Sequence, residues 1–135
     1  MLLGQFDFMK NLVLSFIEKN KQLCCLKNIG KYHKNKLIGV IGIQEVKDVT
    51  LIRHAYTLTH YQGKGAGSEL LKYLLKKNQN SRLLVGTWKE ATWAILFYKK
   101  FGFALHAKDQ STLLLKKYWK ISSKQIKHSV VLERF

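Results

Sequence analysis

The sequence contains no proline, only two cysteines and few acidic side chains. The cysteines, Cys24 and Cys25, are adjacent and have no Cys-x-x-Cys or His-rich spacing around them. That arrangement argues against a disulfide framework or a zinc site, and we expect two reduced thiols and no metal. No apolar run approaches the roughly 20 residues of a membrane-spanning helix. Charged side chains interrupt the first 20 residues, unlike a signal peptide, so we expect a cytoplasmic protein that does not bind membranes.

The chain also lacks internal repeats, low-complexity tracts and flexible linkers. Its 135 residues, 47% of them hydrophobic, match the size and composition of one domain with an ordinary core. We therefore expect a single domain over residues 1–135.

Negative charge is scarce: 24 basic residues face 8 acidic ones, for a net charge of +16. Three explanations compete, namely an anionic ligand or partner, nucleic acid, and a compositional bias toward lysine. The lysines are dispersed rather than gathered in a binding tail. The chain has neither an aromatic–basic RNA motif nor a helix-turn-helix signature, so nucleic acid is disfavoured. Compositional bias is the favoured explanation.

Hydrophobic periodicity predicts a mixed order of elements. Apolar residues spaced by three and four predict helices over Phe6–Glu18, Gly67–Lys77, Lys89–Lys100 and Ser111–Tyr118. Strands are expected over Leu23–Ile29, Lys36–Val46, Val49–Thr57, Arg82–Thr87 and Ser129–Leu132, with a further strand beginning near Phe103. Gly30–Asn35 is expected to be a turn, and Ser122 or Ser123 with Gln125 a short capped turn. This order favours an α/β sandwich with helices on both faces of the sheet.

A glycine-rich loop, Gln62-Gly63-Lys64-Gly65-Ala66-Gly67, joins the strand ending near Thr57 to the next helix. Helix N-terminal amides, the helix dipole and close backbone approach at glycine together favour a pyrophosphate site. Lys64 adds a positive charge and Ser68 a hydroxyl. The loop lacks the Gly-Lys-Ser/Thr of a P-loop, and it follows a meander rather than the first strand of a Rossmann unit. A glycine-rich turn without a ligand is the alternative.

Two motifs resemble a known family. Gln62-x-x-Gly65-x-Gly67 is similar to the Q/R-x-x-G-x-G/A loop of the GCN5-related N-acetyltransferases, the GNAT superfamily. The downstream Ala94-Ile-Leu-Phe97-Tyr98-Lys-Lys-Phe-Gly102-Phe103 resembles that family's second signature. Gly86-Thr87-Trp88 and Tyr118-Trp119 resemble small bacterial members. The implied fold is a mixed, mostly antiparallel sheet flanked by helices on both faces.

The resemblance implies an acetyl-CoA-dependent N-acetyltransferase that transfers acetyl to a primary amine by direct attack in a ternary complex. The loop would hold the pyrophosphate, and the preceding strand end would pair with the pantetheine arm. The implied cofactor-binding residues are Tyr56, Thr57, Leu58, Gln62, Gly63, Lys64, Gly65, Ala66, Gly67, Ser68, Phe97 and Tyr98. Tyr98 would also protonate the leaving thiolate as a catalytic acid. Its alternative is a core tyrosine.

A general base is less clear. His54 is the one residue on the strand before the loop that titrates near neutrality. Counted from Gln62, however, the familiar histidine position is occupied by Arg53, and a shift of one residue changes the sheet face. Glu45 and Glu90 are alternatives that also fit solvated surface acids. The three tryptophans could line an acceptor pocket or pack in the core: Trp88, Trp93 and Trp119.

The chain departs from the family at its N-terminus, where about twenty residues precede Lys21. A more open acceptor site, completion by a second subunit in a homodimer, and a shortened product with reduced activity would each fit. The alternative functions are a catalytically weak CoA-binding module and a basic nucleic-acid-binding protein. The acceptor, a small-molecule or protein amine, cannot be read from the sequence.

Overall fold

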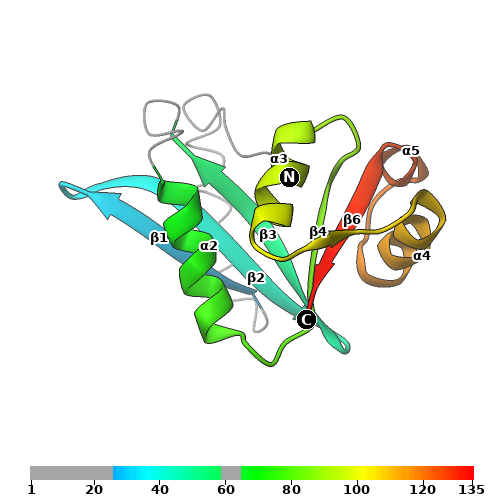
Figure 1. Cartoon of the computed structure of the whole chain (residues 1–135), viewed down its shortest axis with the longest axis horizontal. Helices are drawn as coiled ribbons and strands as arrows, with labels where there is room; N and C mark the ends of the chain where they lie inside the picture. Colours follow the sequence, from blue (N-terminus) through cyan, green and yellow to red (C-terminus); the bar gives the residue numbers. More distant parts are fainter. Residues whose placement is uncertain (1–25, 59–64) are drawn as a thin grey trace.

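The computed structural model describes residues 26–58 and 65–135 (Figure 1). The helix expected over Phe6–Glu18 lies outside these residues, as do Cys24 and Cys25 and the loop residues Gln62, Gly63 and Lys64. The strands are β1 Leu26–His33, β2 Lys36–Val46, β3 Val49–Thr57, β4 Leu83–Trp88, β5 Ala104–Leu105 and β6 Ser129–Arg134. The helices are α2 Ala66–Lys77, α3 Thr92–Lys100, α4 Lys108–Tyr118 and α5 Ser123–Lys127. None of these helices is long and apolar enough to cross a membrane.

The described strands form one six-stranded sheet in the order β1-β2-β3-β4-β6-β5. β1, β2 and β3 make the expected antiparallel meander. β4 pairs parallel to β3, and β6 then runs antiparallel to both β4 and β5. The sheet is therefore mixed and mostly antiparallel, as predicted.

Helices cover both faces of the sheet (Figure 1). α2 and α3 bury Leu71, Leu74 and Tyr98 against one face, where Ile52 and Val85 contribute from the strands. α4 packs on the other face with a second set of buried residues, formed by Val49, Leu51, Leu84, Leu114, Leu115, Tyr118, Trp119 and Val131. Adjacent residues of β3 and β4 are thus buried on opposite faces, which explains why both strands read as nearly continuous apolar runs.

The turn of the first hairpin is shorter than predicted. The turn expected over Gly30–Asn35 is confined to Lys34 and Asn35, and β1 continues to His33, which pairs with Lys36. Both turn residues have positive φ, 50° for Lys34 and 65° for Asn35. A two-residue turn of this kind matches the twist of the flanking strands, so pairing continues up to the turn. The polar side chains of the hairpin had suggested a longer loop.

The C-terminal elements agree closely with those predicted from the sequence. α4 begins at Lys108, three residues before the expected Ser111. The capped turn is the start of α5, where the Ser122 side chain accepts from the Gln125 backbone and the Gln125 side chain accepts from the Ser122 backbone. This reciprocal pair is the capping box that the Ser-x-x-Gln spacing predicts.

Candidate active site

The site is built on the separation of β3 from β4. Their parallel ladder comprises three residue pairs, from Thr50 with Leu83 to Ile52 with Val85. Beyond Ile52, β3 follows β2 to Thr57, whereas β4 follows β6 to Trp88. The two strands therefore diverge toward their carboxyl ends, as Figure 1 shows. Ligands of open α/β sheets bind at such carboxyl ends.

A bulge in β3 coincides with the start of this divergence. Arg53 pairs with Gly42 and Tyr56 with Val40, so two residues of β3 lie opposite one residue of β2. Ile52 and Ala55 consequently pack in the same core cluster although they are three residues apart. A bulge bends its strand and increases the local twist. We attribute the departure of β3 from β4 to this bend.

The described part of the glycine-rich loop opens α2. Gly65 is the N-cap, with φ of 87°, a conformation that strains residues with a side chain. Glycine has no side-chain oxygen to cap the helix, so the first-turn amides remain available to an anion in front of them. A Cβ placed on Gly65 would meet no described atom within 4 Å apart from the adjacent backbone of the chain. The residues present therefore fit the pyrophosphate of acetyl-CoA.

Several of the predicted cofactor-binding residues lie next to one another in the structure. Tyr56, Thr57, Gly67 and Phe97 line one narrow recess between β3, α2 and α3. Leu58 packs beside the first residue of α2 in an adjoining cluster. Burial raises the pKa of the Tyr56 hydroxyl. Three separate elements thus bring together residues that lie far apart in the sequence.

Tyr98 belongs to α3, and its side chain packs on the α2–α3 face of the sheet in the core cluster that includes Ile52 of β3 and Val85 of β4. In Figure 1, α3 lies over the region where β3 and β4 diverge. Its side chain is 1% exposed. The ring makes edge contacts with Phe97 and Phe103, with centroids 5.2 and 5.4 Å away. Burial raises the pKa of its hydroxyl well above the usual range, so the group stays protonated at physiological pH. A protonated phenol can donate a proton or a hydrogen bond.

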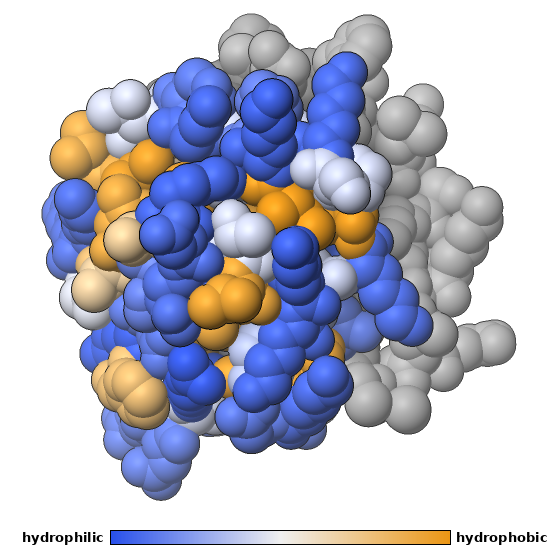
Figure 2. Space-filling model, turned by 90° about the vertical axis from the view of Figure 1, so that its right-hand side faces the viewer, coloured by the Kyte–Doolittle hydropathy of each residue, from blue (hydrophilic) through white to orange (hydrophobic). Residues whose placement is uncertain are grey.

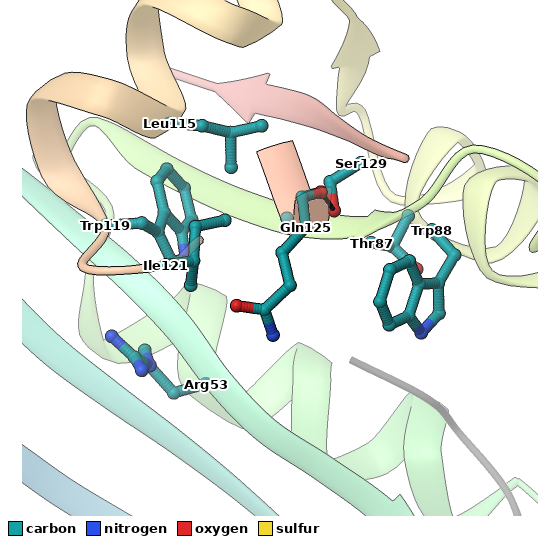
Figure 3. Close-up of a pocket in the computed structure, with 9 residues that line it drawn as sticks. Arg53, Thr87, Trp88, Leu115, Trp119, Ile121, Gln125 and Ser129 are labelled. Atoms are coloured by element: carbon teal, nitrogen blue, oxygen red, sulfur yellow. Dashed lines mark hydrogen bonds between the residues drawn. The ribbon is translucent and has the colours of Figure 1, made fainter. Parts of the chain in front are cut away.

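A second pocket of about 220 Å³ opens on the opposite face, between β3, β4, α4 and α5. Figure 3 shows side chains from β3 and β4 facing those of the α4–α5 segment across it, with the Gln125 amide reaching between Trp119 and Trp88. The lining consists of Arg53, Gly86, Thr87, Trp88, Leu115, Trp119, Ile121, Gln125 and Ser129. Trp88 and Trp119 line this pocket, and Trp119 also belongs to the buried cluster beneath α4. Trp93 is 46% exposed and lies outside this lining.

Arg53 is the charged residue of the pocket, and sequence reasoning did not select it. Its Nη1 donates to Gln44 Oε1 at 3.1 Å. Desolvation by burial lowers its pKa. Within residues 26–58 and 65–135, Arg53 takes part in none of the ion pairs. The sequence did contain a signal that could have identified Arg53. It is an arginine within an apolar strand, and it stands where the family resemblance, counted from Gln62, would place a histidine.

The candidate bases differ in their placement. His54 belongs to β3 and lies in the bulge between Arg53 and Tyr56, while its side chain falls outside the description. Glu45 is exposed on β2. Glu90 is 67% exposed and pairs with Lys89 at 3.9 Å. Neither glutamate lines the pocket.

Comparisons with known proteins agree with this geometry. Residues 23–105, more than half of the chain, match the family model described as "Acetyltransferase (GNAT) domain". No curated protein sequence matches the chain.

Among solved structures, an acetyltransferase of the GNAT family from Staphylococcus aureus Mu50 superposes with a TM-score of 0.70 at 18% identity, covering 96% of this chain and 86% of the other. A GNAT family acetyltransferase from Elizabethkingia anophelis with acetyl-CoA bound gives a TM-score of 0.65 at 21% sequence identity. The match covers 88% of this chain and 80% of the other. PaiA N-acetyltransferase from Thermoplasma acidophilum, in complex with coenzyme A, superposes with a TM-score of 0.63 at 17% sequence identity. The match covers 95% of this chain and 72% of the other.

At these identities the structures establish the likeness of fold, and the family model establishes membership. The chain belongs to the GNAT family of acetyltransferases, for which acetyl-CoA is the acetyl donor.

Proposed function

We propose that this protein transfers the acetyl group of acetyl-CoA to a primary amine by direct attack within a ternary complex. One observation carries the proposal: a recess that contains several of the predicted cofactor residues lies on the α2–α3 side of β2 and β3, and a separate pocket lies on the α4 side of β3 and β4. Two substrates could thereby approach β3 from opposite sides of the sheet. A binding module for CoA alone would have no need of the second pocket.

Acetyl-CoA would supply an activated thioester carbonyl. The first-turn amides of α2 from Ala66 to Ser68, together with Gln62, Gly63, Lys64 and Gly65, would bind its pyrophosphate. Tyr56, Thr57 and Leu58 at the end of β3 would align the pantetheine arm, with Phe97 forming an apolar wall. The recess supports the assignments of Tyr56, Thr57 and Phe97, and the α2 N-terminus supports that of its first turn, whereas Gln62, Gly63 and Lys64 are assigned from the sequence motif.

The reaction forms one C–N bond and breaks one C–S bond. The amine nitrogen attacks the thioester carbonyl, the thiolate leaves, and the nitrogen loses one proton while the sulfur gains one. Tyr98 is the proposed donor to sulfur, because its hydroxyl is neutral and its ring packs in the same cluster as Ile52 and Val85, the last pair of the β3–β4 ladder. His54 is the proposed acceptor of the amine proton, directly or through water.

A comparison of free energies indicates that positioning of the two substrates contributes more to the rate acceleration than a general base does. A lysine-like amine with a pKa of about 10.4 is mostly protonated, and deprotonating it at pH 7 costs about 4.6 kcal/mol. Alignment of two bound reactants contributes on the order of 7–11 kcal/mol. Positioning by the two pockets thus exceeds the deprotonation cost, so a modest base suffices.

Calorimetric titration with acetyl-CoA, and separately with CoA, tests the cofactor half of the proposal. We expect 1:1 binding at micromolar affinity. Acetylation of a broad amine panel then tests catalysis. Products should be detected by mass rather than with a thiol reagent, since Cys24 and Cys25 would react with that reagent themselves. Binding without turnover would favour a CoA-binding module, and absence of binding at low salt would reject the proposal.

A further inference from the structure

The Arg53 guanidinium has more donors than the described protein groups use. A guanidinium carries five N–H donors in a planar fork. One hydrogen bond is recorded for Arg53, from Nη1 to Gln44 Oε1. The group is desolvated enough for burial to lower its pKa. A partly buried charge is costly unless something pairs with it, so the site favours an anion supplied from outside the protein.

The rest of the described lining offers no negatively charged partner for Arg53. Its other residues are neutral, with Trp88 and Trp119 forming aromatic walls and Gln125 contributing an amide. No carboxylate belongs to this described lining. A polycationic acceptor would therefore face a like charge in Arg53 and find no counter-charge there. An anionic group would find one.

The two helices that border the pocket carry several lysines. Figure 2 shows the side of the molecule that carries α4 and α5, which is hydrophilic over most of its area. α4 ends with Lys116 and Lys117, and α5 contains Lys124 and Lys127. Asp109 is the acidic residue of these two helices. A positive field at the mouth of a pocket raises the local concentration of anions.

We propose that the acceptor is a small amine that also carries a carboxylate, which binds the Arg53 guanidinium while the amine faces the β3–β4 gap. This assignment rests on the proposed acetyl transfer. The fork of arginine matches a carboxylate in two parallel hydrogen bonds. The volume of about 220 Å³ is below the roughly 300–1,000 Å³ of pockets for drug-sized ligands. An amino acid therefore fits the pocket better than a polypeptide.

The same contact aids the chemistry. A nearby positive charge disfavours the protonated form of an amine and lowers its pKa. Arg53 would thus increase the neutral fraction of a bound amino group, in addition to fixing its direction. Its predicted role is to position the acceptor and determine specificity.

Matched acceptors test the assignment in the unaltered protein. Alanine, leucine and phenylalanine are each compared with their carboxamides and with the amines that lack the carboxyl group. We expect kcat/KM to be about tenfold or more higher for the carboxylates, as for other hydrogen bonds between charged groups. The carboxamides have less basic amines, so a difference in nucleophile protonation alone would run the opposite way. Equal or higher kcat/KM for the carboxamides would overturn the assignment and leave acetyl transfer standing.

Variants locate the effect. In Arg53→Gln we expect the preference for carboxylates to disappear, because kcat/KM falls much further for the carboxylates than for the carboxamides, and we expect CoA affinity to stay unchanged. Arg53→Lys should retain part of the preference, because it keeps the charge without the fork. Lys76→Gln, on the exposed side of α2, removes the same charge elsewhere and should keep the full preference. A preference that survives Arg53→Gln would overturn the assignment. If no compound is acetylated, the assignment falls, and the separate CoA titration decides whether the proposed function falls with it.

Discussion

The indole of Trp119 rests directly on the backbone of Gly86. A Cβ placed on Gly86 would lie 3.3 Å from Trp119 Cζ2 and 3.5 Å from Cε2. Both residues line the pocket on the α4 side of the sheet. Because Gly86 has no side chain, the Trp119 ring can approach the backbone of β4 closely, and this contact determines the position of one aromatic wall of the pocket.

Substitution of Gly86 tests this relationship. Gly86→Val should displace the Trp119 ring, raise KM for the amine several-fold and cost roughly 1–3 kcal/mol of stability, as overpacking does. Affinity for CoA should not change, because the recess for the cofactor lies on the other face. Steady-state kinetics and calorimetry measure the two effects. The double variant with Trp119→Phe, which carries a smaller ring, should recover part of the loss. No recovery would mean that the added side chain acts on something other than the ring.

The α2 N-cap offers a matched pair of glycines. Gly65 and Gly102 both have positive φ, 87° and 88°. Alanine at either position should cost about 1 kcal/mol in backbone strain. Only Gly65→Ala should weaken binding of CoA, because only that site faces the proposed pyrophosphate. Calorimetric titration compares the two. Equal CoA affinity in both variants would remove the loop from the binding site.

Tyr98→Phe tests the proposed proton donor. We expect kcat to fall by about 100-fold, within the range for loss of a general acid, with nearly unchanged CoA affinity. Tyr118→Phe is the matched control: its hydroxyl donates to Asp48 Oδ1 at 2.6 Å on the β2–β3 turn. That variant should lose about 1 kcal/mol of stability and keep its kcat. A kcat in Tyr98→Phe equal to that of the parent would reject the acid role.

A buried glutamate predicts a pH dependence of stability. Glu133, whose side chain is 8% exposed, accepts from Arg82 Nε at 2.6 Å and lies 2.7 Å from His106 Nε2. The Arg82 hydrogen bond, followed by that of His106, lowers the pKa of the Glu133 carboxyl below its ordinary 4.5. A lowered folded-state pKa stabilises the fold above the unfolded pKa, and this stabilisation is lost as the pH falls through the folded pKa.

The free energy of unfolding should therefore decline as the pH drops below about 4.5. Glu133→Gln should flatten this decline and cost roughly 1–3 kcal/mol at neutral pH. Denaturant unfolding at several pH values measures both. A parent-like slope in Glu133→Gln would assign the acid sensitivity to other carboxyls.

The sequence predicted most elements because their signals are local. Alternating and three-four spacing identified the meander, α2 and α3, and the Ser122-x-x-Gln125 spacing identified the start of α5. The position of the glycine-rich loop between a strand and a helix could likewise be predicted from the sequence. The outer strand was misjudged because a tight turn at Lys34 and Asn35 keeps polar residues within the ladder.

Features that depend on packing across the chain could not be predicted. The β3 bulge arises from register with β2, so counting residues from Gln62 could not decide which face Arg53 occupies. Gln125 and Ser129 reach the pocket because α5 folds back over β4, far from them in sequence. The Arg82–Glu133 pair joins residues 51 positions apart. Such partners become visible only when the fold is known.

The brevity of the β3–β4 ladder has a mechanical consequence. Three residue pairs join two otherwise continuous half-sheets, β1-β2-β3 and β4-β6-β5. A molecule bound across the divergence acts as a brace between these halves. Amides of Thr50–Ile52 should then exchange with solvent more slowly when the donor and acceptor sites are filled. The melting temperature should rise with ligand concentration by mass action. The cooperativity of the sheet should thus depend partly on whether the two sites are occupied, and it should change during each catalytic cycle as ligands bind and leave.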